Sequence, residues 1–179
     1  MAQSKTAFQL LLDIDQRCRS LAAGLPLQEP RPHGWSGIGF RMGERFYVAP
    51  MGEVEEILHE PRYAVLQGVK PWIRGIANLR GRLLPIMDLH AFFGHELSPS
   101  RKPRRVLVID YQDVFVGLLV DEVLGMQHFN ERSLMPELPD DSEPDIAPYS
   151  QGRFLREQAW RVFSPRALVQ SPGFMDVAL

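Results

Sequence analysis

The hydrophobic pattern of the chain has a helical period at its start. Over residues 6–23, apolar side chains recur in steps of four and three, which predicts an amphipathic helix. Thr6 and Gln9 have the spacing of a capping box, in which each side chain accepts a free backbone N–H. Gly24 and Pro26 predict the end of the helix. The apolar stripe consists of Ala7, Leu11, Ile14, Cys18, Leu21 and Leu25.

This stripe allows two interpretations. It packs on the body of the protein, which we favour, or it docks on a partner, which its heptad spacing permits. Cys18 lies on the stripe, so we interpret it as a small buried hydrophobe rather than a reactive thiol. Prolines and glycines across residues 25–37 predict an extended linker, and the main fold then begins near Trp35. We divide the chain into a helix and linker over residues 1–34, a body over residues 35–171 and a tail over residues 172–179.

The body has the two-residue period of β-strands. Apolar residues alternate over residues 38–42 and 45–49, with turn chemistry at Gly43 and Glu44, which together predict a β-hairpin. The same order of strand, turn, strand and Glu-Val occurs again further along the chain. The second copy has Leu107, Ile109, Gln112-Asp113, Phe115 and Glu122-Val123 where the first has Ile38, Phe40, Gly43-Glu44, Phe46 and Glu53-Val54. This repeat predicts two similar small sheets or barrels built from one chain.

Two central stretches shape the predicted fold. Residues 72–94 combine three glycines, an apolar run broken by Pro85 and a short helix pattern, and they contain no plausible catalytic set. Residues 114–120 are apolar nearly throughout, which predicts a strand buried on both faces. Gly117 within that strand predicts a bulge or a close approach of another backbone.

The last third of the chain is less regular. Residues 134–149 form an acidic, proline-rich segment, which predicts a mobile loop. Residues 159–163 resemble a last strand, and Ser164 with Pro165 predicts the start of a short closing helix. We expect the tail after Pro172 to fray.

Composition places the chain among ordinary globular proteins. Hydrophobic residues make up 45% and charged residues 23%, with a net charge of −2, so bulk attraction to nucleic acid or membranes is not expected. Residues 62–105 are mainly basic and residues 121–145 mainly acidic, which can steer a partner of either sign. No apolar run approaches the ~18 residues of a membrane span, and the start lacks the form of a signal peptide. The expected compartment is the cytoplasm.

Catalytic and metal-binding patterns are missing from the sequence. Cys18 is the lone cysteine, and histidines 33, 59, 90, 95 and 128 form no convincing ligand pair with a carboxylate. There is no Gly-x-Ser-x-Gly elbow and no phosphate loop, and the Gly37-Ile-Gly39 run lacks the third glycine of a dinucleotide site. Asp140 and Asp141 are adjacent carboxylates in the acidic loop, where solvation explains them. We therefore predict no enzyme activity, no cofactor and no metal.

A nucleic-acid-binding barrel is one alternative. Such barrels place aromatic platforms beside basic residues, as Trp72 with Arg74, Arg80 and Arg82 would do. Aromatic residues make up only 9% of the chain, and the Phe92-Phe93 pair fits core packing better. We therefore predict no nucleic-acid partner.

The motif around residues 71–89 resembles the signature of CheW, the chemotaxis coupling protein family. It reads Pro-x-Ile-x-Gly-Ile-x-Asn-Leu-Arg-Gly, followed by Leu-Pro-Ile-x-Asp-Leu. The resemblance extends in register from about Ser36 to Val169 and includes residues 43–48, 54–57 and 116–121. The N-terminal helix and the Ala-Pro-Met-Gly-Glu-Val segment are closer to the CheW-like adaptors of type IV pilus (twitching) systems.

This resemblance implies a mainly β fold of two intertwined five-stranded SH3-like barrels, here with an N-terminal amphipathic helix and short helices. It also implies a non-enzymatic adaptor that joins the cytoplasmic tip of a chemoreceptor to the regulatory domain of a CheA-type histidine kinase. The expected location is the cytoplasmic receptor array beneath the inner membrane, without insertion into it, where other CheW-like proteins are possible partners. Twitching motility is the expected output, and a flagellar chemotaxis array is the alternative.

The resemblance also assigns roles to individual residues. The expected receptor contacts are Gly75, Asn78, Arg80, Gly81 and Gly117, and the expected kinase contacts are Val54, Glu56 and Ile57. Pro85, Asp88 and Gly94 are expected to be structural, as an edge or bulged-strand proline, a helix N-cap and a helix terminator.

Several of these roles have rivals. Arg80 either contacts the receptor or braces the two barrels through backbone carbonyls, and Val54 and Ile57 either touch a partner or lie in the core. Gly75 and Gly81 are also expected to permit close backbone approach or positive φ at turns. The chain departs from the family in the N-terminal helix, in the acidic loop and at His90, where the family often has arginine.

Overall fold

The computed structural model describes residues 6–21, 34–136 and 145–179, and the chain divides into two units, residues 1–32 and 33–179. In the first unit, α1 (Ala7–Leu21) begins with the predicted capping box: the Thr6 N–H donates to Gln9 Oε1 at 3.0 Å and the Gln9 N–H to Thr6 Oγ1 at 3.4 Å. Cys18 is exposed within this unit, which has no other described element that could cover the stripe, so its burial against the body stays a prediction.

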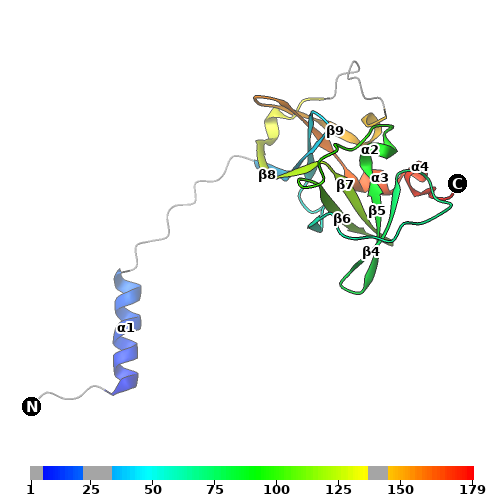
Figure 1. The fold of residues 1–179 in the computed structure, drawn as a ribbon. Helices are drawn as coiled ribbons and strands as arrows, with labels where there is room; N and C mark the ends of the chain where they lie inside the picture. The colour runs from blue at the N-terminus through cyan, green and yellow to red at the C-terminus, as the bar shows by residue number, and fades with distance from the viewer. Residues whose placement is uncertain (1–5, 22–33, 137–144) are drawn as a thin grey trace, which may run out of the picture. The chain divides into compact units, whose positions relative to one another are not determined.

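The second unit is built from two five-stranded sheets (Figure 1). Sheet A has the order β8-β1-β2-β10-β9 and sheet B the order β3-β6-β7-β5-β4. Sheet A comprises β1 (Gly34–Met42), β2 (Arg45–Pro50), β8 (Glu122–Asn130), β9 (Ser150–Leu155) and β10 (Ala159–Phe163). Sheet B comprises β3 (Glu56–His59), β4 (Ile73–Leu79), β5 (Arg82–Asp88), β6 (Arg105–Tyr111) and β7 (Val114–Val120).

The internal repeat predicted from the sequence is present and explains this topology. Hairpins β1–β2 and β6–β7 turn at equivalent places, where Gly43 and Gln112 have φ of 60° and 53°. The three strands after each hairpin cross to the other sheet: β3, β4 and β5 join β6–β7, and β8, β9 and β10 join β1–β2. Each sheet therefore contains strands from both halves of the chain, which confirms the intertwined fold.

The two sheets are alike in two further ways. Each contains one parallel pair of strands, and in each a short helix starts directly after one strand of that pair. Strand β5 runs parallel to β7 with Ile86 beside Gly117, and β10 runs parallel to β2 with Val162 beside Val48. A short capped helix follows each of these strands: α2 (Leu89–Phe92) after β5, and α3 (Pro165–Val169) after β10. Ser164 is the N-cap of α3, as predicted, and accepts from the Ala167 N–H.

The hydrophobic core consists of clusters that lie both between the two sheets and within each sheet. Strand β7 is buried from Val116 to Val120, and only Val114 and Phe115 at its start are half-buried, so the predicted buried strand is confirmed. A fully buried Leu or Phe side chain contributes about 1.5–3 kcal/mol through the hydrophobic effect. The largest cluster joins both sheets and includes Phe40, Tyr47, Leu107, Ile109, Leu118, Phe163 and Phe174.

The C-terminal tail is docked, which corrects the prediction that it frays after Pro172. Ser171 caps α4 (Pro172–Met175), and Phe174 is fully buried against the main cluster. Beyond α4, Ala178 pairs with Val69 in an isolated bridge. A single buried aromatic residue therefore anchors the segment.

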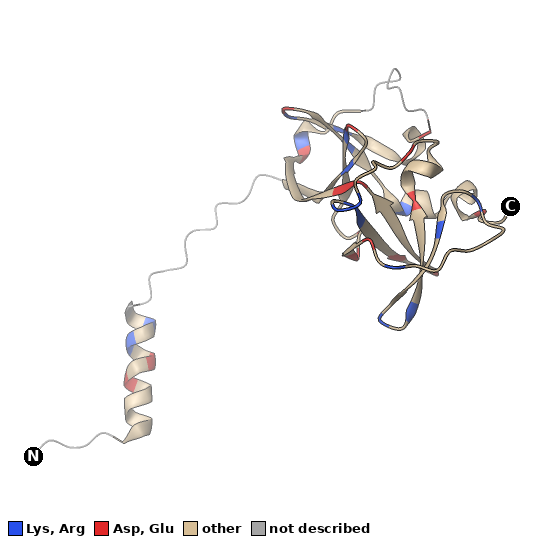
Figure 2. Cartoon of the chain, in the orientation of Figure 1, with Lys and Arg blue, Asp and Glu red and all other residues tan. Residues whose placement is uncertain are grey.

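The predicted acidic loop is only partly described. Residues 137–144 lie outside the described residues, so its predicted mobility stays a prediction. On either side the chain is ordered into two short 3-10 helices, η1 (Glu131–Ser133) and η2 (Ala147–Tyr149). In Figure 2 the positions of acidic and basic residues are interspersed along the ribbon of the second unit, with basic ones at the tip of the β4–β5 hairpin.

Candidate functional site

The β4–β5 hairpin carries three of the five predicted receptor contacts at its tip. Arg80 and Gly81 form the two-residue turn with φ of 52° and 86°, and two positive φ angles are the mark of a type I′ turn. The Asn78 Oδ1 accepts from the Gly81 N–H at 2.8 Å and so holds the turn closed. The Arg80 side chain is 76% exposed, although a left-handed backbone is unusual for a residue with a Cβ.

Arg80 contacts a carboxylate rather than backbone carbonyls. Its Nη2 lies 2.7 Å from Glu56 Oε1 on β3, so a predicted receptor residue and a predicted kinase residue touch each other. Strands β3 and β4 are the two edges of sheet B, so this ion pair joins the edges of the barrel. An exposed pair of this kind contributes only about 0–1 kcal/mol, and a partner can therefore replace it at little cost.

A second ion pair lies beside the first and extends the surface. The Arg82 Nη1 is 2.6 Å from Asp110 Oδ2, and its guanidinium lies 3.7 Å from the centre of the Phe115 ring. The two pairs line one groove, formed by Glu55, Glu56, Leu79, Arg80, Arg82, Val108, Asp110 and Phe115. Sequence reasoning missed Asp110 and Phe115, because their place depends on how β6 and β7 pair within sheet B.

The predicted kinase contacts differ in accessibility. Ile57 on β3 is 38% exposed and so offers an apolar surface at the edge of the sheet. Val54 is half-buried and packs against the main core, as its rival interpretation required. On the hairpin, Leu83 is 67% exposed, and no sequence argument had singled it out.

Gly75 closes the barrel instead of offering a surface. It is buried at φ 148°, and a Cβ there would lie 2.1 Å from the Ala64 carbonyl oxygen. That contact lets Ala64 pair with Ile76, through two N–H···O bonds of 2.9 Å, along the edge of sheet B. Sheet A has the same close approach of two backbone segments at a glycine, since a Cβ at Gly152 would lie 2.5 Å from the Met135 carbonyl oxygen.

Gly117 is likewise buried. A Cβ there would lie 2.5 Å from Val106 Cγ1 and 3.1 Å from Ile86 Cδ1, inside the core of sheet B. Gly75 and Gly117 therefore shape the backbone that carries the hairpin, and of the five predicted receptor residues only Asn78, Arg80 and Gly81 are accessible at its tip.

The residues expected to be structural have defined places. Asp88 is the N-cap of α2, where its Oδ1 accepts from the Ala91 N–H at 3.0 Å, and its Oδ2 receives Arg74 at 2.5 and 2.9 Å. Gly94 follows α2 at φ 74°. Strand β5 is an interior strand, so the edge-strand alternative for Pro85 is wrong. The proline is tolerated because pairing with β7 begins only at Ile86, so no N–H is needed for it at Pro85.

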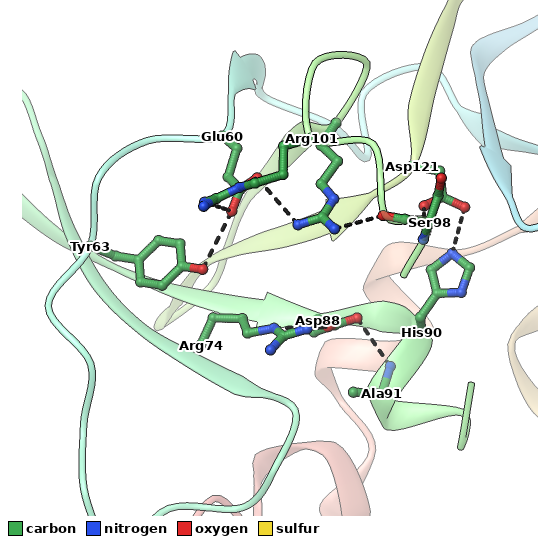
Figure 3. A network of polar contacts seen from close by, with 10 residues as sticks. Glu60, Tyr63, Arg74, Asp88, His90, Ala91, Ser98, Arg101 and Asp121 are labelled. Carbon is green, nitrogen blue, oxygen red and sulfur yellow. Dashed lines mark hydrogen bonds and ion pairs between the residues drawn. The ribbon is translucent and has the colours of Figure 1, made fainter. Parts of the chain in front are cut away.

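Besides Asp88, two carboxylates with buried side chains belong to the network of polar contacts in Figure 3. Glu60 receives the Arg101 Nη2 at 2.7 Å, the Tyr63 hydroxyl at 3.3 Å and the Arg104 guanidinium at 3.5 Å. Burial raises the pKa of the Glu60 carboxyl, but the hydrogen bond and charge of Arg101, with that of Arg104, outweigh burial and hold this pKa below its ordinary value of 4.5. Asp121 is the second carboxylate, and His90 lies 3.0 Å from it.

Neither a metal site nor a membrane span is found in the described part of the chain. Over residues 6–21, 34–136 and 145–179, no three His, Cys, Asp or Glu side chains are grouped so that they would hold a metal ion. No helix in the same ranges has the length and apolar character to cross a bilayer.

These observations define a two-barrel β module with an exposed hairpin and a groove lined by two surface ion pairs. Residues 36–173 match the model of the CheW-like domain family, and the chain belongs to that family. Over its full length it is 63% identical to the full length of Protein PilI of Pseudomonas aeruginosa. It is 26% identical to chemotaxis protein CheW of Helicobacter pylori over 70% of this chain and 76% of that protein.

A solved structure supports the fold. The scaffolding protein TtCheW from Thermoanaerobacter tengcongensis superposes with a TM-score of 0.69 at 22% identity. The superposition covers 98% of that protein but 80% of this chain, so part of this chain has no counterpart there.

Proposed function

We propose that the chain is a non-enzymatic signalling adaptor that couples the cytoplasmic tip of a chemoreceptor to a CheA-type histidine kinase. Its place is the cytoplasmic receptor array beneath the inner membrane, in a system that controls type IV pilus twitching motility. The observation that carries this proposal is the 63% identity to PilI over the full length of both proteins. That match includes the N-terminal helix, which lies outside the family match at residues 36–173.

The proposed receptor surface is the tip of the β4–β5 hairpin, with Asn78, Arg80 and Gly81. The proposed kinase surface is the β3 edge, with the exposed Ile57 and with Glu56, while Val54 supports it from the core. Because Arg80 and Glu56 form an ion pair, a partner that captures one side chain frees the other. The two surfaces are therefore adjacent, which suits a protein that couples one partner to the other.

Reversal of the charge at Arg80 tests the receptor surface. Purified Arg80→Glu is expected to lose receptor-dependent stimulation of kinase autophosphorylation while its unfolding transition stays close to that of the wild type. The matched control is Arg156→Glu, because Arg156 is an exposed arginine at the equivalent turn of sheet A. Normal coupling by folded Arg80→Glu would remove this residue from the site.

The pathway is tested in the cell. Deletion of the gene should abolish twitching and leave swimming intact, and the full-length protein should restore twitching. Loss of swimming with normal twitching would assign the adaptor to a flagellar array instead. Co-purification of both a receptor and a CheA-type kinase with the tagged chain tests the adaptor role independently of the output.

A further inference from the structure

A histidine is buried where the two barrels meet. His90, the second residue of α2, is 4% exposed, and its Nε2 lies 3.0 Å from the Asp121 Oδ2. This is an ion-pair distance, and Asp121 is the polar group nearest to the buried ring. A neutral imidazole fits such a place, whereas an imidazolium there must give up nearly all its hydration.

Asp121 links three segments that are far apart in the sequence. Its Oδ2 accepts from the Gly43 N–H at 2.8 Å, in the β1–β2 turn of sheet A. Its Oδ1 accepts from the Ser98 N–H at 3.0 Å, in the connection between α2 and β6. Asp121 itself lies between β7 of sheet B and β8 of sheet A and is fully buried. The contacts of this one carboxylate therefore hold the turn of one barrel against the connection that follows α2 in the other.

His90 also borders a hollow of about 420 Å³ between these segments. The charged and titratable groups around it come from several elements. They are Asp121 between β7 and β8, Asp88 at the end of β5, His95 and Glu96 after α2, Glu44 and Arg45 in and after the β1–β2 turn, Tyr47 on β2, and Arg41 on β1, 4.0 Å from Asp121. The Asp121 oxygen nearest to His90 already accepts from Gly43. A proton on His90 therefore gains limited compensation from Asp121.

We propose that His90 and Asp121 form a proton-sensitive latch between the two barrels. In the closed state His90 is neutral and packed beside Asp121. When the ring takes up a proton, it moves into the adjoining hollow, where water and the exposed Glu96 receive it. The bonds from the Gly43 and Ser98 amides to Asp121 then loosen, and the β1–β2 turn separates from α2. The latch is a property of the chain alone and does not depend on the proposed adaptor function.

The direction of the effect follows from the environment of the ring. Burial lowers the pKa of His90 below its ordinary value of 6.5, and the opposing Asp121 and Asp88 carboxylates do not fully offset it. A histidine whose pKa is lower in the closed state favours that state above about pH 6.5, and this advantage is lost as the pH falls through the closed-state pKa. Acid therefore opens the latch.

Amide hydrogen exchange on the isolated full-length chain tests the proposal. Between pH 7.5 and 5.5, protection at the Gly43 and Ser98 amides, corrected for intrinsic exchange, is expected to fall by up to about tenfold per pH unit, the limit for one proton. In His90→Gln the protection should not change over the same range. In His95→Gln, which removes the other histidine of the hollow, it should fall as in the wild type.

A second measurement keeps the test decisive if His90→Gln does not fold. An NMR titration of the wild-type chain should give the same midpoint for the His90 ring signals and for the chemical shifts of the Gly43 and Ser98 amides. Protection that is independent of pH in the wild type, an equal loss in folded His90→Gln, or a ring midpoint that differs from the amide midpoint would each overturn the latch.

Discussion

The tips of the β4–β5 and β9–β10 hairpins occupy equivalent places in the two barrels but carry different chemistry. At the first tip, Arg80 lies in a tight two-residue turn and forms an ion pair with Glu56 across the barrel edge. At the second, Arg156 begins a wider turn, closed by its N–H to the Gln158 carbonyl at 3.1 Å. Its guanidinium lies 4.2 Å from the centre of the Phe129 ring on β8.

This difference shows how one fold supports two kinds of contact. The Arg80 pair is exposed and polar, so an incoming charged or polar group can replace either member. The Arg156 contact places a cation over a ring that is itself packed in the core of sheet A, with Phe154 stacked at 4.4 Å. Such a contact covers apolar surface and offers no side chain to exchange. We therefore expect recognition at the first tip and packing at the second.

The largest difference in stability between matched variants of the two barrels is expected at the two helix caps. Asp88→Ala removes the cap of α2 and also leaves Arg74 without its carboxylate partner, which should cost about 3 kcal/mol of unfolding free energy. Ser164→Ala, at the equivalent place in sheet A, removes the cap of α3 and the hydrogen bond of 2.8 Å from the Ser164 hydroxyl to Glu53, and it should cost about 1–2 kcal/mol. Urea unfolding followed by tryptophan fluorescence measures both.

Asp88→Asn is the control for this comparison, because the amide oxygen can still cap the helix while the negative charge is lost. It should fall between the two alanine variants. Equal costs for Asp88→Ala and Ser164→Ala would show that the Arg74 contact adds no more to stability than the contact of Ser164 with Glu53.

The next largest difference in stability is expected where two strands run parallel near the centre of each sheet. Gly117→Ala places a Cβ 2.5 Å from Val106 Cγ1, and overpacking of this kind costs about 1–3 kcal/mol. The equivalent position of sheet A, beside Val162, already holds the fully buried Val48. Val48→Ile is therefore the matched control, and it should cost less if only sheet B requires a glycine there. Thermal unfolding of both variants decides between these outcomes.

Local pattern was enough to predict the β1–β2 and β6–β7 hairpins, the repeat, and the caps of α1 and α3. Alternation, turn residues and the Ser164-Pro165 pair act over a few positions, so the sequence shows them directly. The exchange of strands between the sheets is not local, because an apolar strand pairs equally well with either of two similar hairpins. Only the family resemblance supplied that feature.

The contacts within the site could not be predicted from the sequence, because they form only in the closed barrel. Arg80 and Glu56 were assigned to different partners, since nothing in the sequence shows that opposite edges of sheet B meet. Asp121 and His90 were not predicted to be buried, because a charged or titratable residue at a strand or helix end usually lies in solvent. Phe174 was missed for a similar reason, because its tail has the composition of a frayed end.

The third prediction concerns how stability depends on pH through Glu60 and its contacts with Tyr63, Arg101 and Arg104. The pKa of Glu60 is lowered in the folded state, so its contribution to stability is present above about pH 4.5 and is lost as the pH falls through the folded-state pKa. The unfolding free energies of the wild type and Glu60→Gln should therefore differ most above pH 5 and converge in stronger acid. A difference that is constant from pH 7 to pH 3 would contradict the assignment.

The smallest effect on stability is expected at the two arginine tips. Arg80→Glu and Arg156→Glu should each change the unfolding free energy by no more than about 1 kcal/mol, because both side chains are exposed. Function should separate them, with receptor-dependent kinase stimulation lost in the first variant only. The double variant Arg80→Glu with Glu56→Arg restores an ion pair with its charges exchanged, so it should recover stability but not coupling. Normal coupling by the double variant would mean that the ion pair matters and that the cation at the hairpin tip does not.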